Sequence, residues 1–454
     1  MKTKVIILAA GQGTRMKSRL PKVLHRLAGR PLLAHVVDTA RLLSPADIRV
    51  VVGHGGEQVQ ASLDGQDIVW CWQHQQLGTG HAVQQAMDGI EADDRVLILY
   101  GDVPLIRADT LVGLLAVTRD TPLAILTSKL GDPSGYGRIL RDAEGAIRAI
   151  REHKDATEAE RLVTEINTGI MAVRGAELMR WLGQLEANNA QGELYLTDIV
   201  EKAVQENLTV GSLTVTDPYE VAGINTRVQL AELERVVQRR EAERLMSQGV
   251  TLSDPARIDV RGHLHVEQDI YIDVNCVFEG EVWLAEGVLI EPGCVIRNSR
   301  IGPGTRIRAH SVIEGAVVQA NVEIGPFARL RPGTELADGS KIGNFVEVKK
   351  ARIGEGSKVN HLSYIGDATL GRRVNVGAGT ITCNYDGANK HHTEIGDEVF
   401  IGSDSQLIAP VTIGRGATIG AGSTITRDVS ADTLALSRSR QIERPDWKRP
   451  VKKK

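Results

Sequence analysis

Several residue types that would direct the interpretation elsewhere are scarce in this sequence. Its 454 residues include only four cysteines, Cys71, Cys276, Cys294 and Cys383, and no two of them form a CxxC pair. This scatter argues against a zinc site and favours a reducing compartment. The formal net charge is only −3, whereas a nucleic-acid-binding protein is usually more basic. Composition therefore indicates no nucleic-acid partner.

Long apolar runs are also missing. No run approaches the roughly 18 residues that a membrane-spanning helix needs. The first four residues lead directly into an apolar strand, so we expect no signal peptide. A soluble cytoplasmic protein without a membrane partner is the resulting expectation. At 454 residues the chain is too long for one ordinary core, which predicts two or three structural units.

Aromatic residues make up only 4% of the chain, whereas glycines number 47, and the second half has an aliphatic repeat of six residues. A period of six fits neither an α-helix nor a single strand, and it is typical of a parallel β-helix built from hexapeptide repeats. We predict that the aliphatic side chains point inward and that the glycines beside them form tight corners. The aliphatic positions are Ile301, Ile307, Ile313, Val318, Ile324, Leu330, Leu336, Ile342, Val348, Ile353, Val359, Ile365, Leu370 and Val376, then Ile395, Ile401, Leu407, Ile413, Ile419 and Ile425.

The first residues predict a phosphate-binding turn. An apolar run at residues 5–10 is followed by Gly11-Gln12-Gly13-Thr14-Arg15-Met16, which reads as strand, glycine loop and helix. The third glycine of the dinucleotide fingerprint is absent, and no Walker GK[ST] sequence follows. Arg15 and Lys22 place two cations near a candidate phosphate. The alternative is a tight turn with ordinary surface cations.

The elements that follow alternate as in an α/β domain. The pattern predicts helices at residues 32–43 and from near residue 82, and strands at 48–52, 69–72 and 96–100. Asp102 comes directly after the last of these strands, where open parallel sheets bind ligands. Such an aspartate either caps a turn or holds Mg²⁺ beside a polyphosphate.

These motifs together resemble the sugar-1-phosphate nucleotidyltransferases. The resemblance is carried by residues 8–16, Pro21-Lys22, residues 77–82, Tyr100-Gly101-Asp102, residues 135–139 and residues 165–169. With the hexapeptide repeats behind them, nearly the whole chain resembles the bacterial bifunctional N-acetylglucosamine-1-phosphate uridyltransferases/glucosamine-1-phosphate N-acetyltransferases. Gln12 is a departure, since lysine is more usual there, which would remove one cation from the loop.

The resemblance implies an α/β Rossmann-like nucleotidyltransferase domain at residues 1–225, then a helical arm at 226–248. A β-helix acetyltransferase domain, left-handed in relatives, is implied at 249–437, with a basic tail at 438–454. Apolar residues between 228 and 246 predict one packed face on the arm helix.

The resemblance also implies that the first domain transfers UMP from UTP to N-acetylglucosamine-1-phosphate. Arg15 and Lys22 would act as catalytic cations, and Asp102 and Asn225 would hold Mg²⁺. The implied contacts to UTP and to the sugar nucleotide are Leu8, Ala9, Ala10, Gly11, Lys22, Gln73, Gly78, Thr79, Tyr100, Gly101, Asp102, Gly137, Glu152, Asn167 and Asn225.

Residues that a regular hexapeptide repeat does not require indicate a second candidate site. Arg331, Lys349, His361, Tyr364 and Asn375 lie at spacings near multiples of six, so neighbouring coils could bring them to one edge. Solvated corner residues are the alternative interpretation. The repeat is also interrupted by residues 382–390, and insertions in solenoids often lie on the binding face.

In the family, this second site acetylates glucosamine-1-phosphate with acetyl-CoA. The resemblance implies His361 as general base, since histidine titrates near neutral pH. Arg331 and Lys349 would bind the phosphate, and Tyr364 and Asn375 the sugar. Acetyl-CoA or acceptor contacts are implied for Ala378, Asn384, Tyr385, Ser403, Ala421 and Arg438. Relatives trimerise, so a homotrimer with sites at subunit contacts is expected.

Two other functions remain open at this point. A β-helix that only trimerises would leave a single nucleotidyltransferase, but a scaffold has no need of His361, Tyr364 or the inserted loop. A solenoid binding protein with a degenerate front domain would not need Arg15, Lys22, Asp102 and Asn225 together.

Overall fold

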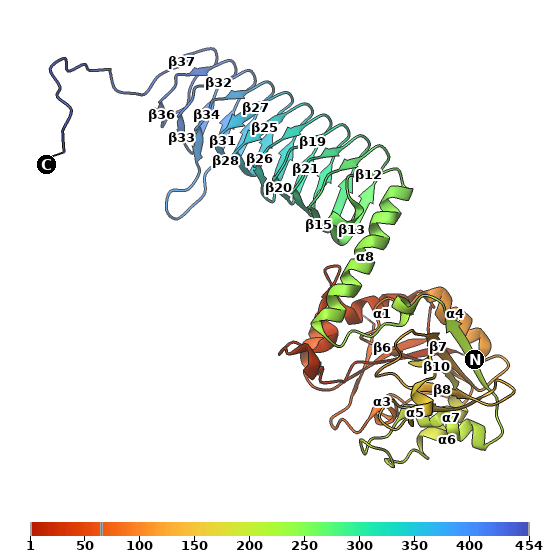
Figure 1. Ribbon diagram of the computed structural model, residues 1–454. Helices are drawn as coiled ribbons and strands as arrows, with labels where there is room; N and C mark the ends of the chain where they lie inside the picture. Colours follow the sequence, from red (N-terminus) through yellow and green to blue (C-terminus); the bar gives the residue numbers. More distant parts are fainter. Residues whose placement is uncertain (1, 64, 66, 453–454) are drawn as a thin grey trace. The chain divides into compact units, whose positions relative to one another are not determined.

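The computed structural model describes residues 2–63, 65 and 67–452, and it divides into two compact units, residues 1–236 and 237–454. Figure 1 shows an α/β unit and a stack of coils. Within the described residues, no helix is long and apolar enough to cross a membrane. The domain limits proposed above remain predictions, since the division falls inside the arm helix α8 (Arg227–Ser247).

The first unit is built on one twisted sheet. Its strand order is β11 (Val210–Val215), β7 (Leu123–Lys129), β10 (Glu165–Arg174), β6 (Arg95–Tyr100), β1 (Thr3–Leu8), β4 (Asp47–Val52) and β5 (Val69–Trp72). β10 is antiparallel to both of its neighbours, whereas β6, β1, β4 and β5 are parallel. A hairpin of β8 (Arg138–Arg141) and β9 (Ile147–Arg151) joins the sheet at β10, and β2 (Arg26–Leu27) pairs with β3 (Arg30–Pro31).

Helices cover both faces of this sheet because its central strands are apolar on both sides. In β1, Val5 and Ile7 pack with α1 (Leu32–Arg41), α2 (Gly56–Ser62) and α4 (Ala108–Val117). Ile6 and Leu8 pack on the other face with α3 (Thr79–Gln84), α6 (Gly175–Leu182) and α7 (Ile199–Gln205). The remaining helical segments are α5 (Glu158–Arg161) and four 3-10 turns, η1 (Thr14–Met16), η2 (Lys22–Leu24), η3 (Leu196–Asp198) and η4 (Pro218–Val221).

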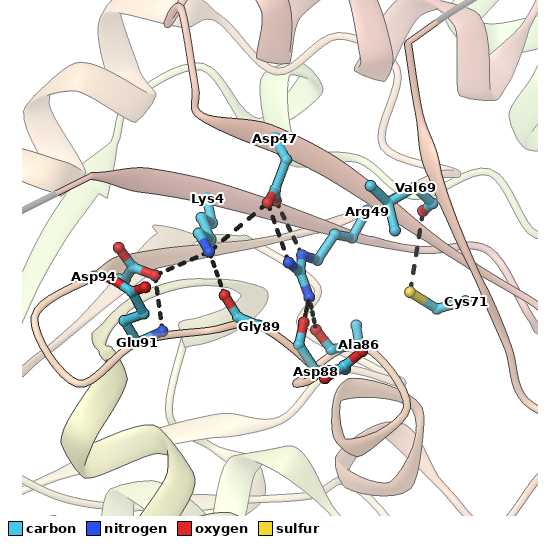
Figure 2. Close-up of polar contacts among 10 residues, drawn as sticks. All are labelled: Lys4, Asp47, Arg49, Val69, Cys71, Ala86, Asp88, Gly89, Glu91 and Asp94. Carbon is cyan, nitrogen blue, oxygen red and sulfur yellow. Dashed lines mark hydrogen bonds and ion pairs between the residues drawn. The ribbon is translucent and has the colours of Figure 1, made fainter.

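An ion-pair network ties the N-terminal ends of the strands to the loop before β6 (Figure 2). Lys4 pairs with the buried Asp94 at 3.2 Å and donates to the Gly89 carbonyl. Arg49 binds both oxygens of Asp47 and donates to the carbonyls of residues 86 and 88. These charges are paired, as the burial of charged groups requires. They stabilise the N-terminal ends of the strands, opposite the carboxyl ends of the sheet.

The prediction of a helix directly after the glycine loop was wrong. Only the 3-10 turns η1 and η2 follow, and the first α-helix begins at Leu32. Gly13 and Lys17 lie in left-handed conformations on either side of η1, and Pro21 has no N–H with which to continue a helix. A bound phosphate would therefore meet loop amides and side-chain cations, without a helix N-terminus.

The other predicted elements of this unit are present within a few residues. The helix at 32–43 ends at Arg41, and the helix predicted from residue 82 begins at Thr79. The strands at 48–52, 69–72 and 96–100 correspond to β4, β5 and β6.

The second unit is a β-helix, as the repeat predicts. All twenty aliphatic positions are buried, and the most exposed, Ile425, has an exposed fraction of 5%. Figure 1 shows the coils stacked in chain order from β12 to β37, with residues between β30 and β31 leaving the stack as a loop. The strands of one sheet are β12 (Thr251–Leu252), β14 (Tyr271–Ile272), β16 (Leu289–Ile290), β19 (Arg306–Ile307), β22 (Glu323–Ile324), β25 (Lys341–Asn344), β27 (Lys358–His361), β29 (Asn375–Val376), β32 (Phe400–Ile401), β35 (Thr418–Ile419) and β37 (Leu434–Ala435).

A second set of strands forms the other walls of the coil. They are β13 (Ile258–Val266), β15 (Cys276–Leu284), β17 (Val295–Arg297), β18 (Arg300–Ile301), β20 (Val312–Glu314), β21 (Ala316–Val318), β23 (Arg329–Leu330), β24 (Thr334–Leu336), β26 (Glu347–Ile353), β28 (Tyr364–Leu370), β30 (Ile381–Cys383), β31 (Thr393–Ile395), β33 (Gln406–Ile408), β34 (Val411–Ile413) and β36 (Thr424–Ile425), after the 3-10 turn η5 (Pro255–Arg257). A β-carbon on Gly343 would lie 1.9 Å from the Asn360 carbonyl oxygen of the next coil, so close approach requires glycine there.

The arm helix has one packed face, as its sequence predicts, although not every apolar residue lies on it. Leu233 and Leu245 are buried, whereas Val228 is 66% exposed. Ala242 and Leu245 join the core of the β-helix, where Gln238 also bonds to both backbone groups of Val260. Leu233, Gln238, Ala242 and Leu245 are buried at intervals of about a helical turn and so form one face of the helix.

Candidate active sites

A cavity of about 610 Å³ opens at the carboxyl ends of β1, β5 and β6. It is the position at which parallel sheets bind ligands. Eleven of the residues predicted to bind nucleotide or sugar line it, namely Leu8, Ala9, Ala10, Gly11, Lys22, Gln73, Gly78, Thr79, Tyr100, Asp102 and Asn225. Sequence reasoning did not select Gln12, Val23, Gln76, Ala82 and Glu193, which also line it. Gln76 and Ala82 belong to segments already singled out, so proximity to Gly78 and Thr79 was an available signal.

Three polar side chains that line this cavity, Lys22, Asp102 and Asn225, come from distant segments and converge, and the exposed Arg15 joins them through Asn225. Lys22 Nζ is 2.5 Å from Asp102 Oδ2 and 3.0 Å from Asn225 Oδ1. Arg15 Nη2 donates to the same Asn225 oxygen at 2.9 Å. The N–H of Ile224 donates to the Asp102 carbonyl, so the backbone also joins these two segments. Lys22 thus joins the carboxylate of Asp102 to the amide oxygen of Asn225, and Arg15 bonds to that same amide oxygen.

The oxygen pair fits a magnesium ion. Asp102 Oδ2 and Asn225 Oδ1 both lie within 3.0 Å of one positively charged atom, Lys22 Nζ. Mg²⁺ is usually bound by one or two protein oxygens, with waters and substrate phosphates completing its shell. Asp102 Oδ2 and Asn225 Oδ1 would be two such protein oxygens.

Gln73 is fixed at the base of the cavity. It is 3% exposed, and its Nε2 donates to the Gly78 carbonyl and lies 3.1 Å from His81 Nδ1. With both amide hydrogens directed there, Oε1 is the polar atom left to accept from a ligand. Gly78 has φ 110°, and a β-carbon on it would lie 2.5 Å from the Leu194 carbonyl oxygen, so the backbone of this loop needs glycine.

The residues predicted to bind the sugar also gather, although Gly137, Glu152 and Asn167 lie outside the cavity lining. The N–H of Asn167 donates to the Gly137 carbonyl at 2.8 Å, and a β-carbon on Gly137 would lie 3.3 Å from Glu152 Oε1. Burial raises the pKa of Glu152, while the Thr197 hydroxyl bonds to its Oε1. Burial also raises the pKa of Tyr100, with Glu152 and Asp102 adding to the shift. Gly101, between the site residues Tyr100 and Asp102, is buried beneath this arrangement.

In the β-helix, one corner of successive coils collects several predicted residues. The buried residues Ile342, Val359, Val376, Ile401 and Ile419 are paired in order. The residues two positions after them are Asn344, His361, Ala378, Ser403 and Ala421. Backbone hydrogen bonds link these corners, since Gly379 donates to the His361 carbonyl and Asp404 to that of Ala378. Four predicted residues and Asn344 therefore form one column.

Asn344 is the functional partner that sequence reasoning missed. Its Oδ1 lies 2.7 Å from His361 Nδ1, across one coil. With Nδ1–H donating to Asn344, the lone pair of Nε2 is free on the exposed ring. The signal was the equal offset of Asn344 and His361 from Ile342 and Val359.

The two cations predicted to bind the sugar phosphate lie on adjacent coils of the β-helix. Arg331 and Lys349 follow the paired residues Leu330 and Val348, and Arg331 Nη1 donates to Glu347 Oε1 at 2.8 Å. Lys390, from the inserted loop, was not predicted. Its pKa is lowered by Lys349, because neighbouring ammonium groups repel each other.

The inserted loop is joined to this group through Asn384, which is 7% exposed. Asn384 Nδ2 donates to Asp367 and lies 3.4 Å from the Tyr364 hydroxyl. Tyr385 is 60% exposed and its hydroxyl donates to the Gly387 carbonyl. Arg438 donates to the Ala421 carbonyl at 2.8 Å.

Asn375 is not brought into this group by its pairing. It lies in β29, between Lys358 and Phe400 of adjoining coils, rather than in the corner column of His361.

Comparison with known proteins gives one family match in each of the two units. Residues 5–169 match the MobA-like NTP transferase domain, and residues 392–427 match the bacterial transferase hexapeptide (six repeats). A protein named bifunctional protein GlmU from Marinobacter nauticus is 58% identical over 448 residues, with 99% of each chain covered. Proteins of the same name from Burkholderia vietnamiensis and an Azoarcus species are each 57% identical, with 99% of this chain and 99% and 100% of theirs covered.

This sequence identity extends over both units of the chain. The chain therefore belongs to the GlmU family, and it is a bifunctional transferase of UDP-N-acetylglucosamine synthesis, with a UDP-N-acetylglucosamine diphosphorylase and a glucosamine-1-phosphate N-acetyltransferase in one polypeptide.

Proposed function

We propose that the two reactions occur at the two clusters described above. The β-helix site acetylates glucosamine-1-phosphate with acetyl-CoA, and the α/β site then transfers UMP from UTP to N-acetylglucosamine-1-phosphate, releasing pyrophosphate. The product would feed peptidoglycan and lipopolysaccharide precursors. The convergence of Lys22, Asp102 and Asn225 in one cavity, with Arg15 bonded to Asn225, is the observation that carries the assignment of the second step.

Uridylyl transfer needs positioning and charge neutralisation more than acid–base chemistry. The attacking phosphate is already anionic, so the barrier comes from repulsion between phosphates and from the in-line geometry. Lys22 supplies fixed positive charge at the cavity wall, and Arg15 supplies it beside Asn225. Asp102 and Asn225 would hold Mg²⁺, and the ion would supply further positive charge to neutralise the phosphates.

The uracil ring is read at Gln73. Its Oε1 accepts from the N3–H of uracil, whereas cytosine has no hydrogen at N3. The backbone of Leu8, Ala9, Ala10 and Gly11, with Gly78 and Thr79, forms the rest of the base pocket. Gly137, Glu152 and Asn167 bind the sugar beside Tyr100.

Acetyl transfer uses His361 as general base. Nε2 takes a proton from the amine of glucosamine-1-phosphate as the nitrogen attacks the thioester carbonyl, and the thiolate of coenzyme A leaves. Asn344 holds the Nδ1–H and so keeps Nε2 in the accepting form. Hydrogen bonding of the remote nitrogen is a common way of fixing a histidine tautomer.

The substrates of this step bind along the same coils. Arg331, Lys349 and Lys390 bind the sugar phosphate, and Tyr364 and Asn375 bind the sugar. Acetyl-CoA lies against Ala378, Asn384, Tyr385, Ser403, Ala421 and Arg438. We also propose a homotrimer located in the cytoplasm, in which Asn375 reaches a site completed at a subunit contact.

Two variants test the assignment in separate assays. Asp102→Ala should abolish UDP-N-acetylglucosamine formation from UTP and N-acetylglucosamine-1-phosphate but leave acetylation intact. His361→Ala should do the reverse. Loss of both activities in either folded variant would overturn the proposal of two sites.

A further inference from the structure

His25 is buried directly beneath the segment that carries Lys22. It is 4% exposed, and its N–H donates to the Lys22 carbonyl, so the two residues mark the ends of η2. Val23 and Leu24 between them are buried in the core. The backbone of His25 is therefore held next to that of Lys22.

The ring of His25 contacts the first residue of the arm helix. Arg227 Nη1 donates to His25 Nδ1 at 3.2 Å, and Arg227 lies two residues after Asn225. Burial and the guanidinium of Arg227 both lower the pKa of His25, while the Leu20 carbonyl raises it. A neutral ring is the form that can accept this hydrogen bond.

Two further contacts fix the start of α8. Gln229 Oε1 accepts from the N–H groups of Asn225 and Thr226, and Glu234 Oε2 accepts from the N–H of Ala28 at 2.8 Å. The first turns of the helix are thus bonded to His25 and Ala28, which follow Lys22, and to the backbone of Asn225 and Thr226.

The direct contact between Lys22 and Asn225 cannot persist when a divalent ion is held by Asp102 and Asn225. Lys22 Nζ now lies within 3.0 Å of both oxygens, and two cations at that point would repel each other strongly. The relative position of the two segments must then depend on contacts farther from the ion.

We propose that the His25–Arg227 hydrogen bond, supported by Ala28–Glu234, positions Asn225 against Lys22 when metal and nucleotide are bound. This inference rests on the proposed metal and phosphate roles of Asp102, Asn225 and Lys22. His25 and Arg227 are positioning residues and touch neither substrate nor metal. The start of the arm helix then belongs to the uridylyltransferase site, beyond its role as a connector.

The test is the affinity of the full-length protein for Mn²⁺ in the presence of UTP, measured from the electron paramagnetic resonance signal of free Mn²⁺. Arg227→Met should weaken Mn²⁺ binding by about fivefold, since loss of a group supporting a metal ligand commonly costs a factor of this order or more. Arg227→Lys keeps a donor and should recover most of the affinity. Arg239→Met is the matched control, because Arg239 lies on the same helix and pairs only locally with Glu243.

Kinetics and a double variant complete the test. The Mg²⁺ concentration that gives half-maximal uridylyl transfer should rise with the Mn²⁺ dissociation constant, while acetyl transfer stays unchanged. His25→Gln keeps an acceptor and should act like Arg227→Lys, whereas His25→Leu with Arg227→Met should be no worse than the more damaging single change. Equal Mn²⁺ affinity in Arg227→Met and Arg239→Met would overturn the inference. If Asp102→Ala also left Mn²⁺ binding unchanged, the metal site itself would be wrong.

Discussion

Asn344 Oδ1 lies 2.7 Å from Nδ1 of His361, the residue one coil farther along the same corner of the β-helix. This contact directs Nε2 of the exposed imidazole away from Asn344 and leaves its lone pair free. It supplies the orientation that a general base needs before substrate arrives.

Replacing Asn344 by leucine should lower kcat for acetyl transfer by about 10- to 100-fold, which is part of the effect of a positioned general base. The ring would no longer be held in one tautomer. Steady-state kinetics of both reactions would check this, and uridylyl transfer should not change. Asn344→Asp also accepts from Nδ1–H and should retain more activity than Asn344→Leu. Equal losses in the two variants would remove the role assigned to the hydrogen bond.

Gln73→Leu should reduce the preference for UTP over CTP. Its Oε1 is the acceptor proposed for uracil N3–H, and leucine offers none. We expect kcat/KM for UTP to fall by about tenfold or more, since a site built to hydrogen-bond one substrate discriminates strongly through that contact. Competition between the two nucleotides measures the ratio directly. An unchanged ratio would show that Gln73 supports the loop at Gly78 and does not read the base.

Lys390→Met should raise KM for glucosamine-1-phosphate without changing KM for acetyl-CoA. Lys349 lowers the pKa of Lys390 because the two ammonium groups lie close together and repel each other. A phosphate dianion bound there would relieve this repulsion. The effect should shrink at high ionic strength, since these groups are exposed to solvent. Arg352→Met, an exposed cation change outside this group, is a suitable control. A KM unaffected by Lys390→Met would separate the loop from the phosphate.

Asp198→Asn should stabilise the α/β unit at neutral pH. Burial raises the pKa of Asp198 to about 6, from an ordinary value of 3.8, and Glu201 adds to the shift. The folded state therefore favours the protonated form. Ionisation costs stability above about pH 6, and the cost disappears below pH 3.8, where both states bind the proton.

Thermal unfolding at several pH values would test this. The gain in melting temperature from Asp198→Asn should be about 2 °C or more at pH 7.5, and it should decrease as the pH is lowered through 6. Asp198 lines a second cavity of about 250 Å³, and solvent access to it limits the gain. A gain independent of pH would mean that the carboxylate is not the source of the cost.

The fold was predictable because the repeat and the apolar strands are local patterns. Ile301 and its equivalents mark the core of the β-helix, and Val5 to Leu8 mark the central strand, without reference to distant residues. The absence of an α-helix directly after Gly13 was not predictable in the same way. Left-handed residues on both sides of η1 and the proline at position 21 override a pattern that otherwise reads as strand, loop and helix.

The site depended on contacts that the sequence alone leaves undetermined. Asp102 and Asn225 are far apart in the chain and meet only because β6 and the start of α8 share one edge of the sheet, so the resemblance was needed to pair them. Asn344 was not predicted because its pairing with His361 depends on the register between coils, which spacings along the chain leave undetermined. Lys390 lies in a loop that interrupts the repeat, where the period predicts no position.

The central claim is that two separate sites, one in each unit, carry out two consecutive reactions. Mixing folded Asp102→Ala and His361→Ala proteins tests it most directly, with glucosamine-1-phosphate, acetyl-CoA, UTP and Mg²⁺ as the only substrates and cofactors. Each variant alone should form no UDP-N-acetylglucosamine, and the mixture should form it, because N-acetylglucosamine-1-phosphate made by Asp102→Ala is used by His361→Ala. A mixture that remained inactive, with both proteins folded, would contradict the account.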